Sequence, residues 1–157
     1  MKEIPLSDDR LGSIKNFLAI TDDLGTAGQP TAEQFGDIAA AGYEVVINLD
    51  SATAVPNEDE LVTSRGLSFI HIPVIWTAPQ QSDLDLFFDM LDRLKGRKVF
   101  VHCAANARVS TFVYLYRVAR LGVDPAAAKQ QLDLLWEPTG VWKAFVEEAI
   151  SRLGIQL

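Results

Sequence analysis

The sequence predicts a single α/β domain with a mainly parallel central sheet flanked by helices. Short apolar runs alternate along the chain with amphipathic stretches of about ten to fifteen residues, which is typical of strand–helix–strand crossover units. The largely apolar run 44–49 suits a buried strand of a parallel sheet. No linker, internal repeat or low-complexity tract interrupts the alternation, so we expect residues 1–157 to form one domain.

The predicted elements follow one another in a regular order. Strands are expected at 16–20, 26–29, 44–49, 67–74 and 98–103. Helices are expected at 31–42, 57–66, 82–96, 108–121, 125–135 and 139–153. Thr31 and Gln34 form a capping-box pattern before the first helix, and Asn57 and Glu60 repeat it before the second. Asp124 is a third N-cap candidate, because a proline follows it at the first helical position.

Composition and charge restrict the partners. The chain is 48% hydrophobic and 22% charged, which is ordinary for a globular protein. Its net charge of −7 argues against nucleic-acid and anionic-membrane partners, because both attract clustered Lys and Arg. A small site can still be locally positive, so an anionic substrate is compatible with this charge. The start, MKEIPLSDDR, lacks the apolar core of a signal peptide, and we expect a cytoplasmic protein.

Cysteine and histidine usage limits the kinds of site. The single cysteine excludes an internal disulfide and a Cys-rich zinc site. With two histidines in the chain, a metal site would need carboxylate ligands, and no spacing suggests one. We therefore expect neither a metal ion nor a cofactor.

The segment VHCAANARVS, residues 101–110, carries the chemistry. Cys103 ends a predicted strand just before a predicted helix, and ligands of parallel sheets bind beyond the carboxyl ends of the strands. Backbone N–H groups at such a helix start can surround an anion, and the same field favours a thiolate. Asn106 tolerates the left-handed backbone that a tight cradle requires, and Arg108 offers a planar fork to a tetrahedral oxyanion.

The same segment resembles the signature loop of cysteine-dependent protein phosphatases of the dual-specificity type, in which His-Cys, five residues, Arg and a hydroxyl residue follow one another. GQPTAEQFGDIAAAGYEVVINLD and GLSFIHIPV resemble the upstream strands and connecting helix of that fold. The early GQPT and the short loop are similar to a bacterial phosphatase-like domain that also occurs fused to β-lactamase-like hydrolases. The resemblance implies the dual-specificity-phosphatase fold.

The resemblance also assigns roles to residues. Cys103 would attack phosphorus and form a phosphocysteine, and Arg108 would hold the equatorial oxygens together with the loop N–H groups. His102 would tune the thiol through the hydrogen bonds below it. The oxyanion-binding residues implied in this way are Ala104, Ala105, Asn106, Ala107, Arg108 and Ser110. The expected function is therefore hydrolysis of a phosphate monoester, with a small anionic substrate as the partner.

Departures from the family pattern leave two alternatives open. Four residues separate Cys103 from Arg108 instead of five, and Asn106 stands where the family has a glycine. The short loop is also found in many rhodanese-like sulfurtransferases, so a sulfurtransferase or persulfide carrier on Cys103 is the first alternative. A non-catalytic module that binds an oxyanion is the second.

The usual aspartate acid is not evident in the sequence. Such phosphatases place it just after the strand that matches 67–74, where this chain has IWTAPQQSDLD. Trp76 stands near the expected position and is a candidate pocket wall. The first acids are Asp83 and Asp85, in the first turn of a helix, where carboxylates are ordinary. We expect a slow enzyme, because a general acid contributes roughly 10²–10⁴-fold.

Overall fold

Five strands form one sheet in the computed structural model, which describes residues 10–157. They are β1 (Leu18–Thr21), β2 (Leu24–Ala27), β3 (Val45–Asn48), β4 (Ser68–His71) and β5 (Val99–His102). Their order across the sheet is β1-β2-β5-β3-β4. β1 runs antiparallel to β2, and the other neighbouring pairs are parallel. The mainly parallel sheet is therefore confirmed. The stretch without a signal-peptide core lies, up to residue 9, outside the described residues.

The second strand begins earlier than the sequence indicated. We expected 26–29, but Leu24–Ala27 pairs with β5 as far as His102, the last residue of that strand. The next two residues leave the sheet: the N–H of Gly28 donates to the carbonyl of Lys15 (2.7 Å), and that of Gln29 donates to the carbonyl of Ala104 (3.1 Å). They pair with loops instead of with a strand.

Six helices complete the described chain, as expected. They are α2 (Gln34–Ala40), α3 (Glu58–Thr63), α4 (Gln81–Arg93), α5 (Ala107–Arg120), α6 (Pro125–Asp133) and α7 (Val141–Arg152). The capping box before α2 is confirmed, because Thr31 and Gln34 exchange hydrogen bonds of 2.9 and 3.2 Å. The cap of α6 is also confirmed, since Asp124 accepts from the N–H of Ala127 (3.2 Å).

The capping box before α3 is wrong. Asn57 has φ 56° and ψ 39° and makes no side-chain cap hydrogen bond. A capping residue normally has an extended backbone, and a left-handed residue does not aim its side chain in that way.

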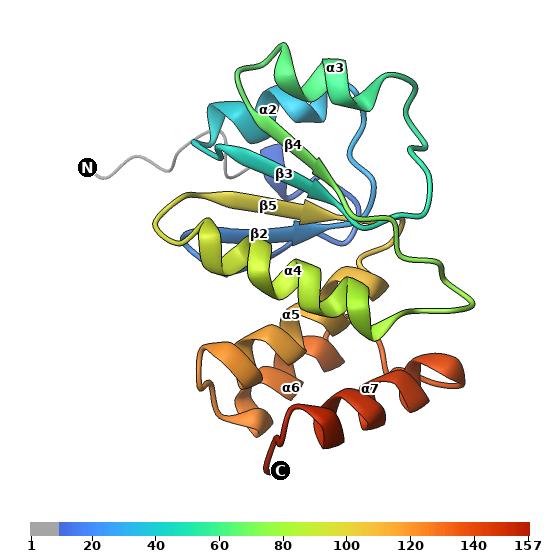
Figure 1. Ribbon diagram of the computed structural model, residues 1–157. Coiled ribbons are helices and arrows are strands. Elements are labelled where there is room, and N and C mark those ends of the chain that lie inside the picture. Colours follow the sequence, from blue (N-terminus) through green and yellow to red (C-terminus); the bar gives the residue numbers. More distant parts are fainter. Residues whose placement is uncertain (1–9) are drawn as a thin grey trace.

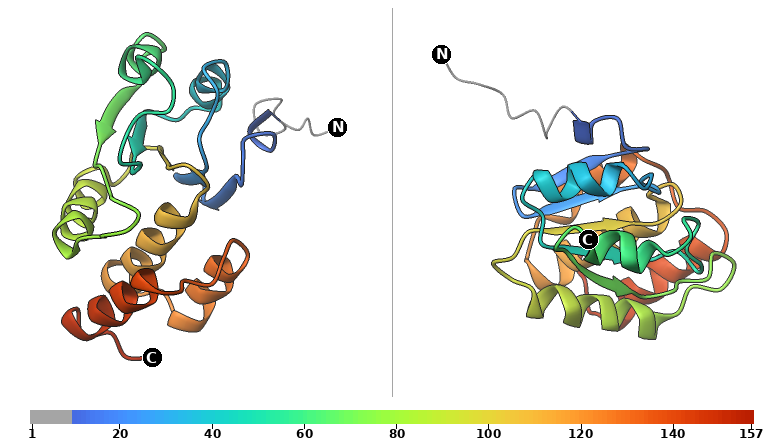
Figure 2. Two further views of the ribbon diagram at one scale, coloured as in Figure 1. Left: turned by 90° about the vertical axis from the view of Figure 1, so that its right-hand side faces the viewer. Right: turned by 90° about the horizontal axis from the view of Figure 1, so that it is seen from above.

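The chain forms three layers, with the sheet in the middle (Figures 1 and 2). α2 and α3 cover one face of the sheet, and α4 and α5 cover the other, with α6 and α7 packed beyond them. Crossover connections between parallel strands are right-handed. Helices can therefore cover both faces only when some crossovers move along the sheet in one direction and others in the opposite direction. The carboxyl ends of β2, β3, β4 and β5 lie together at one edge, and α5 begins there.

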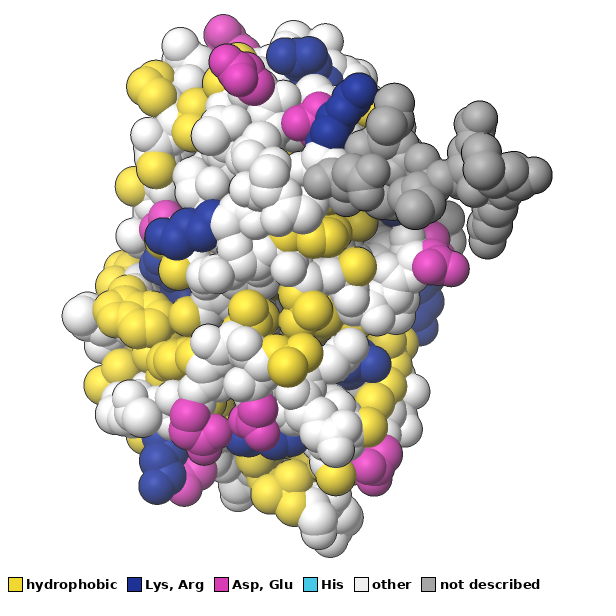
Figure 3. Space-filling view, turned by 180° about the vertical axis from the view of Figure 1, so that it is seen from behind, with side chains coloured by type: hydrophobic (Ala, Val, Ile, Leu, Met, Phe, Trp, Pro, Cys, Tyr) yellow, Lys and Arg dark blue, Asp and Glu magenta, His cyan; other side chains and the backbone are white. Residues whose placement is uncertain are grey.

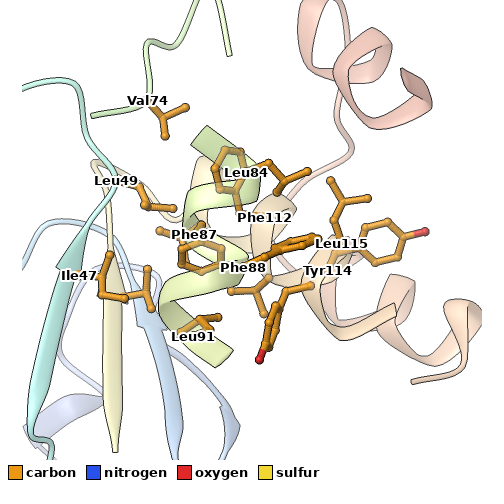
Figure 4. Close-up of a cluster of buried hydrophobic side chains, with 14 of the residues drawn as sticks. Ile47, Leu49, Val74, Leu84, Phe87, Phe88, Leu91, Phe112, Tyr114 and Leu115 are labelled. Atoms are coloured by element: carbon orange, nitrogen blue, oxygen red, sulfur yellow. The ribbon is translucent and has the colours of Figure 1, made fainter. Parts of the chain in front are cut away.

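The period-two alternation of side chains divides the core into two clusters. On β3, Ile47 points toward α4 and α5, where it meets Phe87 and Phe112 (Figure 4). Val46 points the other way and packs in the cluster under α2 and α3 with Phe35. A strand buried on both faces reads as a continuous apolar run, and this explains the segment 44–49.

The same alternation places the residues at the end of β5. Val99, Val101 and Cys103 belong to the cluster on the α4–α5 face. Phe100 lies on the α2–α3 face, and His102 follows it there, with its ring 6.0 Å from that of Phe35. The thiol and the imidazole therefore lie on opposite faces of the sheet although they are adjacent in the chain.

The surface carries charges of both signs. On the side opposite to the view of Figure 1, acidic and basic side chains are interspersed among apolar ones (Figure 3). Among residues 10–157, no helix is long and apolar enough to cross a membrane. The same residues contain no group of three or more His, Cys, Asp and Glu side chains that could hold a metal ion.

Candidate active site

A pocket of about 290 Å³ opens at the carboxyl edge of the sheet, where β5 ends. We call it the Cys103 pocket, and it is lined by Trp76, Cys103, Ala104, Ala105, Ala107 and Arg108. The N–H of Cys103 donates to the carbonyl of Ala27 (3.4 Å), so the residue continues the register of β5 against β2. The structure thus brings the thiol and the guanidinium to one pocket.

Asn106 shapes the loop through its backbone and holds it through its side chain. It has the left-handed conformation expected from the sequence (φ 68°) and precedes the first residue of α5. Its amide Nδ2 donates to the carbonyl of Asn16 (2.9 Å) and to Oγ1 of Thr26 (3.1 Å). Asn16 in turn donates to the carbonyl of Ala105 (2.9 Å). Asn106 therefore shapes the loop but does not line the Cys103 pocket, and its side chain is buried elsewhere.

Gly28 and Gln29, which directly follow β2, support the loop. The N–H of Gln29 donates to the carbonyl of Ala104 (3.1 Å). A Cβ atom on Gly28 would lie 2.7 Å from the same carbonyl oxygen, which is closer than atoms can pack. A glycine at position 28 is therefore required by this close approach, and this gives the GQPT segment a structural reason.

A buried polar network lies beneath the loop. Oε2 of Glu58 is 2.8 Å from Nε2 of His102, and neither side chain is exposed. The other oxygen of Glu58 accepts from Nε2 of Gln29 (3.0 Å). Nδ1 of His102 is 3.4 Å from the carbonyl oxygen of Cys103. The network therefore connects α3, the segment after β2 and the first residue of the loop.

Arg108 is buried and held at both terminal nitrogens. Nη1 donates to the carbonyl of Val74 (2.9 Å), and Nη2 lies 3.1 Å from Oδ1 of Asp50. Its guanidinium carbon is 5.7 Å from the centre of the Trp76 ring. Nε is buried and has no hydrogen-bond partner among residues 10–157. A buried donor without a partner carries a free-energy penalty unless a ligand satisfies it.

Trp76 forms one wall of the Cys103 pocket and is fixed by two other tryptophans. Its ring lies 5.5 Å from that of Trp136 and 5.4 Å from that of Trp142. Nε1 of Trp142 donates to the carbonyl of Trp76 (2.8 Å). The segment after β4 is therefore held against α7 and the loop that precedes it.

Besides His102 and Asn106, whose side chains are described above, three candidates from the sequence do not line the pocket. Ser110 donates its hydroxyl to the carbonyl of Ala107 (3.1 Å) and lines a different hollow with Leu18 and Ile20. Asp85 pairs with Arg152 (2.9 Å) on the surface. Burial raises the pKa of Asp83, which does not line the pocket. Ser110 was expected to contact the oxyanion, but it does not line the Cys103 pocket, and neither aspartate lines it.

Two residues of the site, Asp50 and Glu58, are not among those predicted from the sequence. Asp50 directly follows the largely apolar run 44–49, and a polar residue at the carboxyl end of a parallel strand is a signal for a site. Glu58 lies in the acidic segment NEDE, where acidic residues are ordinary at the start of a helix. Nothing in the sequence distinguishes it from its exposed neighbours.

The fold is that of dual-specificity and tyrosine phosphatases. The chain belongs to the family described as DSP-PTPase phosphatase fused to NAD+ kinase, whose model matches residues 21–143. It is similar to a candidate phosphatase (DUF442) from Shewanella putrefaciens CN-32, with 34% sequence identity over 92% of this chain and 97% of that one, and a TM-score of 0.80.

A more distant relative and a protein that shares the fold are informative. The β-lactamase hydrolase-like protein of Xylella fastidiosa is 27% identical over 143 residues, which is 87% of this chain. The chain spans about a third of the length of that relative, 32%. The structure of P. aeruginosa TpbA in complex with phosphotyrosine shares the fold, with 14% identity, a TM-score of 0.64, and coverage of 84% of this chain and 75% of that one.

Proposed function

We propose that this protein hydrolyses phosphate monoesters through a phosphocysteine on Cys103. The observation that carries the proposal is the buried Nε of Arg108, a donor without a partner on a side chain that lines the same pocket as the thiol. The guanidinium is anchored at Val74 and Asp50, so its position is set before a ligand arrives. A preorganised donor of this kind stabilises developing charge at little reorganisation cost.

The reaction we propose has two displacements at phosphorus. In the first, the Cys103 thiolate forms an S–P bond while the bond between phosphorus and the ester oxygen breaks, and the alcohol or phenol leaves. In the second, water attacks phosphorus, the S–P bond breaks, and inorganic phosphate and the thiolate are released. Arg108 and the loop N–H groups hold the non-reacting oxygens in both steps.

The proton of the leaving group has no donor in the pocket itself. No carboxylate is among the residues that line the Cys103 pocket in the described chain. We therefore propose that water supplies this proton and that the enzyme is slow, most of all with poor leaving groups.

The lining favours a substrate with one phosphate on an apolar or aromatic group. Trp76 and three alanines supply apolar surface, and Arg108 is the one charged side chain among the lining residues. A substrate with several phosphates would need further cations there. The phosphotyrosine complex of TpbA shows a ligand of this kind on the same fold.

The four-residue spacing between Cys103 and Arg108 favours a second candidate function, sulfur transfer. In that case the thiolate would take the outer sulfur of thiosulfate, sulfite would leave, and the persulfide would pass its sulfur to an acceptor such as cyanide. The narrow loop suits a small sulfur donor as well as a phosphate.

One preparation can test both functions. Hydrolysis of an aryl phosphate and formation of thiocyanate from thiosulfate and cyanide should be measured in parallel, with Cys103→Ser as the blank. We expect slow aryl phosphate hydrolysis that the Cys103→Ser variant lacks. Thiocyanate formation without phosphate release would support sulfur transfer and overturn the proposal.

A further inference from the structure

Asp50 is the carboxylate that contacts the functional arginine, and its position is well determined by its surroundings. Oδ1 lies 3.1 Å from Nη2 of Arg108, and the two side chains are 16% and 8% exposed. The N–H of Asp50 donates to Oδ1 of Asn48 (2.8 Å), and the N–H of Ser51 donates to Oδ1 of Asp50 (2.7 Å). Nε2 of His71 is 2.7 Å from the carbonyl oxygen of Asp50. The carboxylate thus has two partners, Arg108 and the N–H of Ser51, and the backbone of Asp50 has two more.

We propose that Asp50 is a positioning residue that also sets the charge of the ligand accepted by the Cys103 pocket. This inference rests on the proposed binding of an oxyanion at Arg108. The carboxylate anchors the guanidinium through Nη2 and neutralises its charge. A ligand at Nε of Arg108 therefore meets a site with little net positive charge from side chains, and this reduces the preference of the site for a doubly charged oxyanion over a singly charged one.

Coulomb's law gives the size of this effect. A ligand bound to the same guanidinium lies within several ångströms of the Asp50 carboxylate, and at that separation each unit of ligand charge is repelled enough to lower its affinity roughly tenfold in a partly screened site. The repulsion energy is twice as large for a doubly charged ligand as for a singly charged one. Asp50 should therefore lower the ratio of dianion to monoanion affinity by about tenfold.

The charge of Asp50 can be separated from its anchoring role. Asp50→Asn keeps the shape and an oxygen that can accept from Nη2, while Val74 still holds Nη1 and Trp76 still faces the guanidinium. The guanidinium therefore keeps its place in this variant, and the loss of the negative charge is the larger change. A purely structural role of Asp50 would instead change the affinities of all oxyanions by the same factor.

The test uses tungstate and perrhenate, which are tetrahedral oxyanions of similar size with two charges and one. Their affinities are measured from the protection of Cys103 against alkylation at constant, mildly alkaline pH and constant ionic strength. We expect the ratio of tungstate to perrhenate affinity to rise about tenfold in Asp50→Asn. Asp85→Asn is the matched control, because it removes the same charge from an aspartate–arginine pair outside the pocket, and it should leave the ratio unchanged.

The outcomes separate this inference from the proposed function. If both oxyanions protect Cys103 and the ratio is the same in the parent and in Asp50→Asn, the role of Asp50 is refuted and the oxyanion site stands. If neither oxyanion protects Cys103 of the parent protein, both proposals fail. Asp50→Ser removes the same charge but has a shorter side chain. If the charge is the cause, the ratio of tungstate to perrhenate affinity must rise about tenfold in Asp50→Ser as well as in Asp50→Asn.

Discussion

His102 and Glu58 form a fully buried pair beneath the Cys103 loop, with 2.8 Å between Nε2 and Oε2. The partner of the other ring nitrogen is the carbonyl oxygen of Cys103, at 3.4 Å. The imidazole is thus fixed between α3 and the residue that carries the nucleophile. Burying a charged pair is expensive, and removing one partner leaves the other without compensation.

The first prediction concerns this pair. Glu58→Ala should lower the free energy of unfolding by about 3–5 kcal/mol, because His102 and Gln29 both lose a buried acceptor. Glu58→Gln should cost less, because an amide oxygen can still accept from His102. Urea unfolding measures both variants. Glu60→Ala is the control on the same helix, since Glu60 is exposed, and an equal loss there would contradict the assignment.

The second prediction concerns the contact between Gly28 and Ala104. Gly28→Ala should destabilise the protein by about 1–3 kcal/mol and weaken protection of Cys103 by tungstate, because the new methyl group forces the backbone of the loop to move. Gly36→Ala is the matched control. Its Cβ would meet the flexible end of Arg65 inside α2, and alanine there should stabilise the helix by about 0.5–1 kcal/mol. Normal protection in Gly28→Ala would show that the loop does not depend on this contact.

The third prediction concerns the guanidinium of Arg108. Arg108→Lys should lose most of the affinity for tungstate although it keeps the charge, because an ammonium group cannot bind Val74, Asp50 and a ligand oxygen in one plane. Isothermal titration measures the affinity. Arg117→Lys changes an arginine of the same helix that bonds Gln131 outside the pocket, and it should bind as the parent does. Unchanged affinity in Arg108→Lys would show that binding of the oxyanion does not need the planar guanidinium.

The fourth prediction uses the raised pKa of Asp83, whose cause is burial. A carboxyl group with a higher pKa in the folded state favours folding at low pH, and this contribution is lost as the pH rises through the folded pKa. Asp83→Asn should therefore gain stability relative to the parent at neutral pH, and the gain should disappear at a pH below the ordinary aspartate value of about 3.9. Thermal unfolding at the two pH values measures it. Aryl phosphate hydrolysis should stay at the parent rate, and a large loss would make Asp83 the missing acid.

Much of the site follows from local sequence. The apolar run before Cys103 predicts a strand, and the helical spacing of apolar residues after Arg108 predicts a helix. The residues between them must then form a loop at the carboxyl ends of the strands. Asn106 is the one residue of that loop for which a left-handed backbone is inexpensive, and it has that conformation. These inferences need only neighbours in the chain.

The roles of Asp50, Glu58 and Ser110 depend on which strands and helices are neighbours in the folded protein. Asp50 meets Arg108 because β3 lies next to β5, and the strand order cannot be derived from one sequence. Glu58 meets His102 because the alternation along β5 turns the imidazole toward α3. Ser110 lies two positions after Arg108, which is roughly 200° around the helix axis, so its side chain faces away from the pocket. Its proximity in the sequence was misleading.

The central claim is that Cys103 carries a phosphoryl group during turnover. The parent protein should be mixed with an aryl phosphate, quenched in acid within the first turnover, digested and analysed by mass spectrometry. We predict that the peptide containing Cys103 becomes heavier by one phosphoryl group, and that the Cys103→Ser variant releases no phenol under the same conditions. A Cys103 peptide that gains one sulfur from thiosulfate, and no phosphoryl group from the aryl phosphate, would contradict the account.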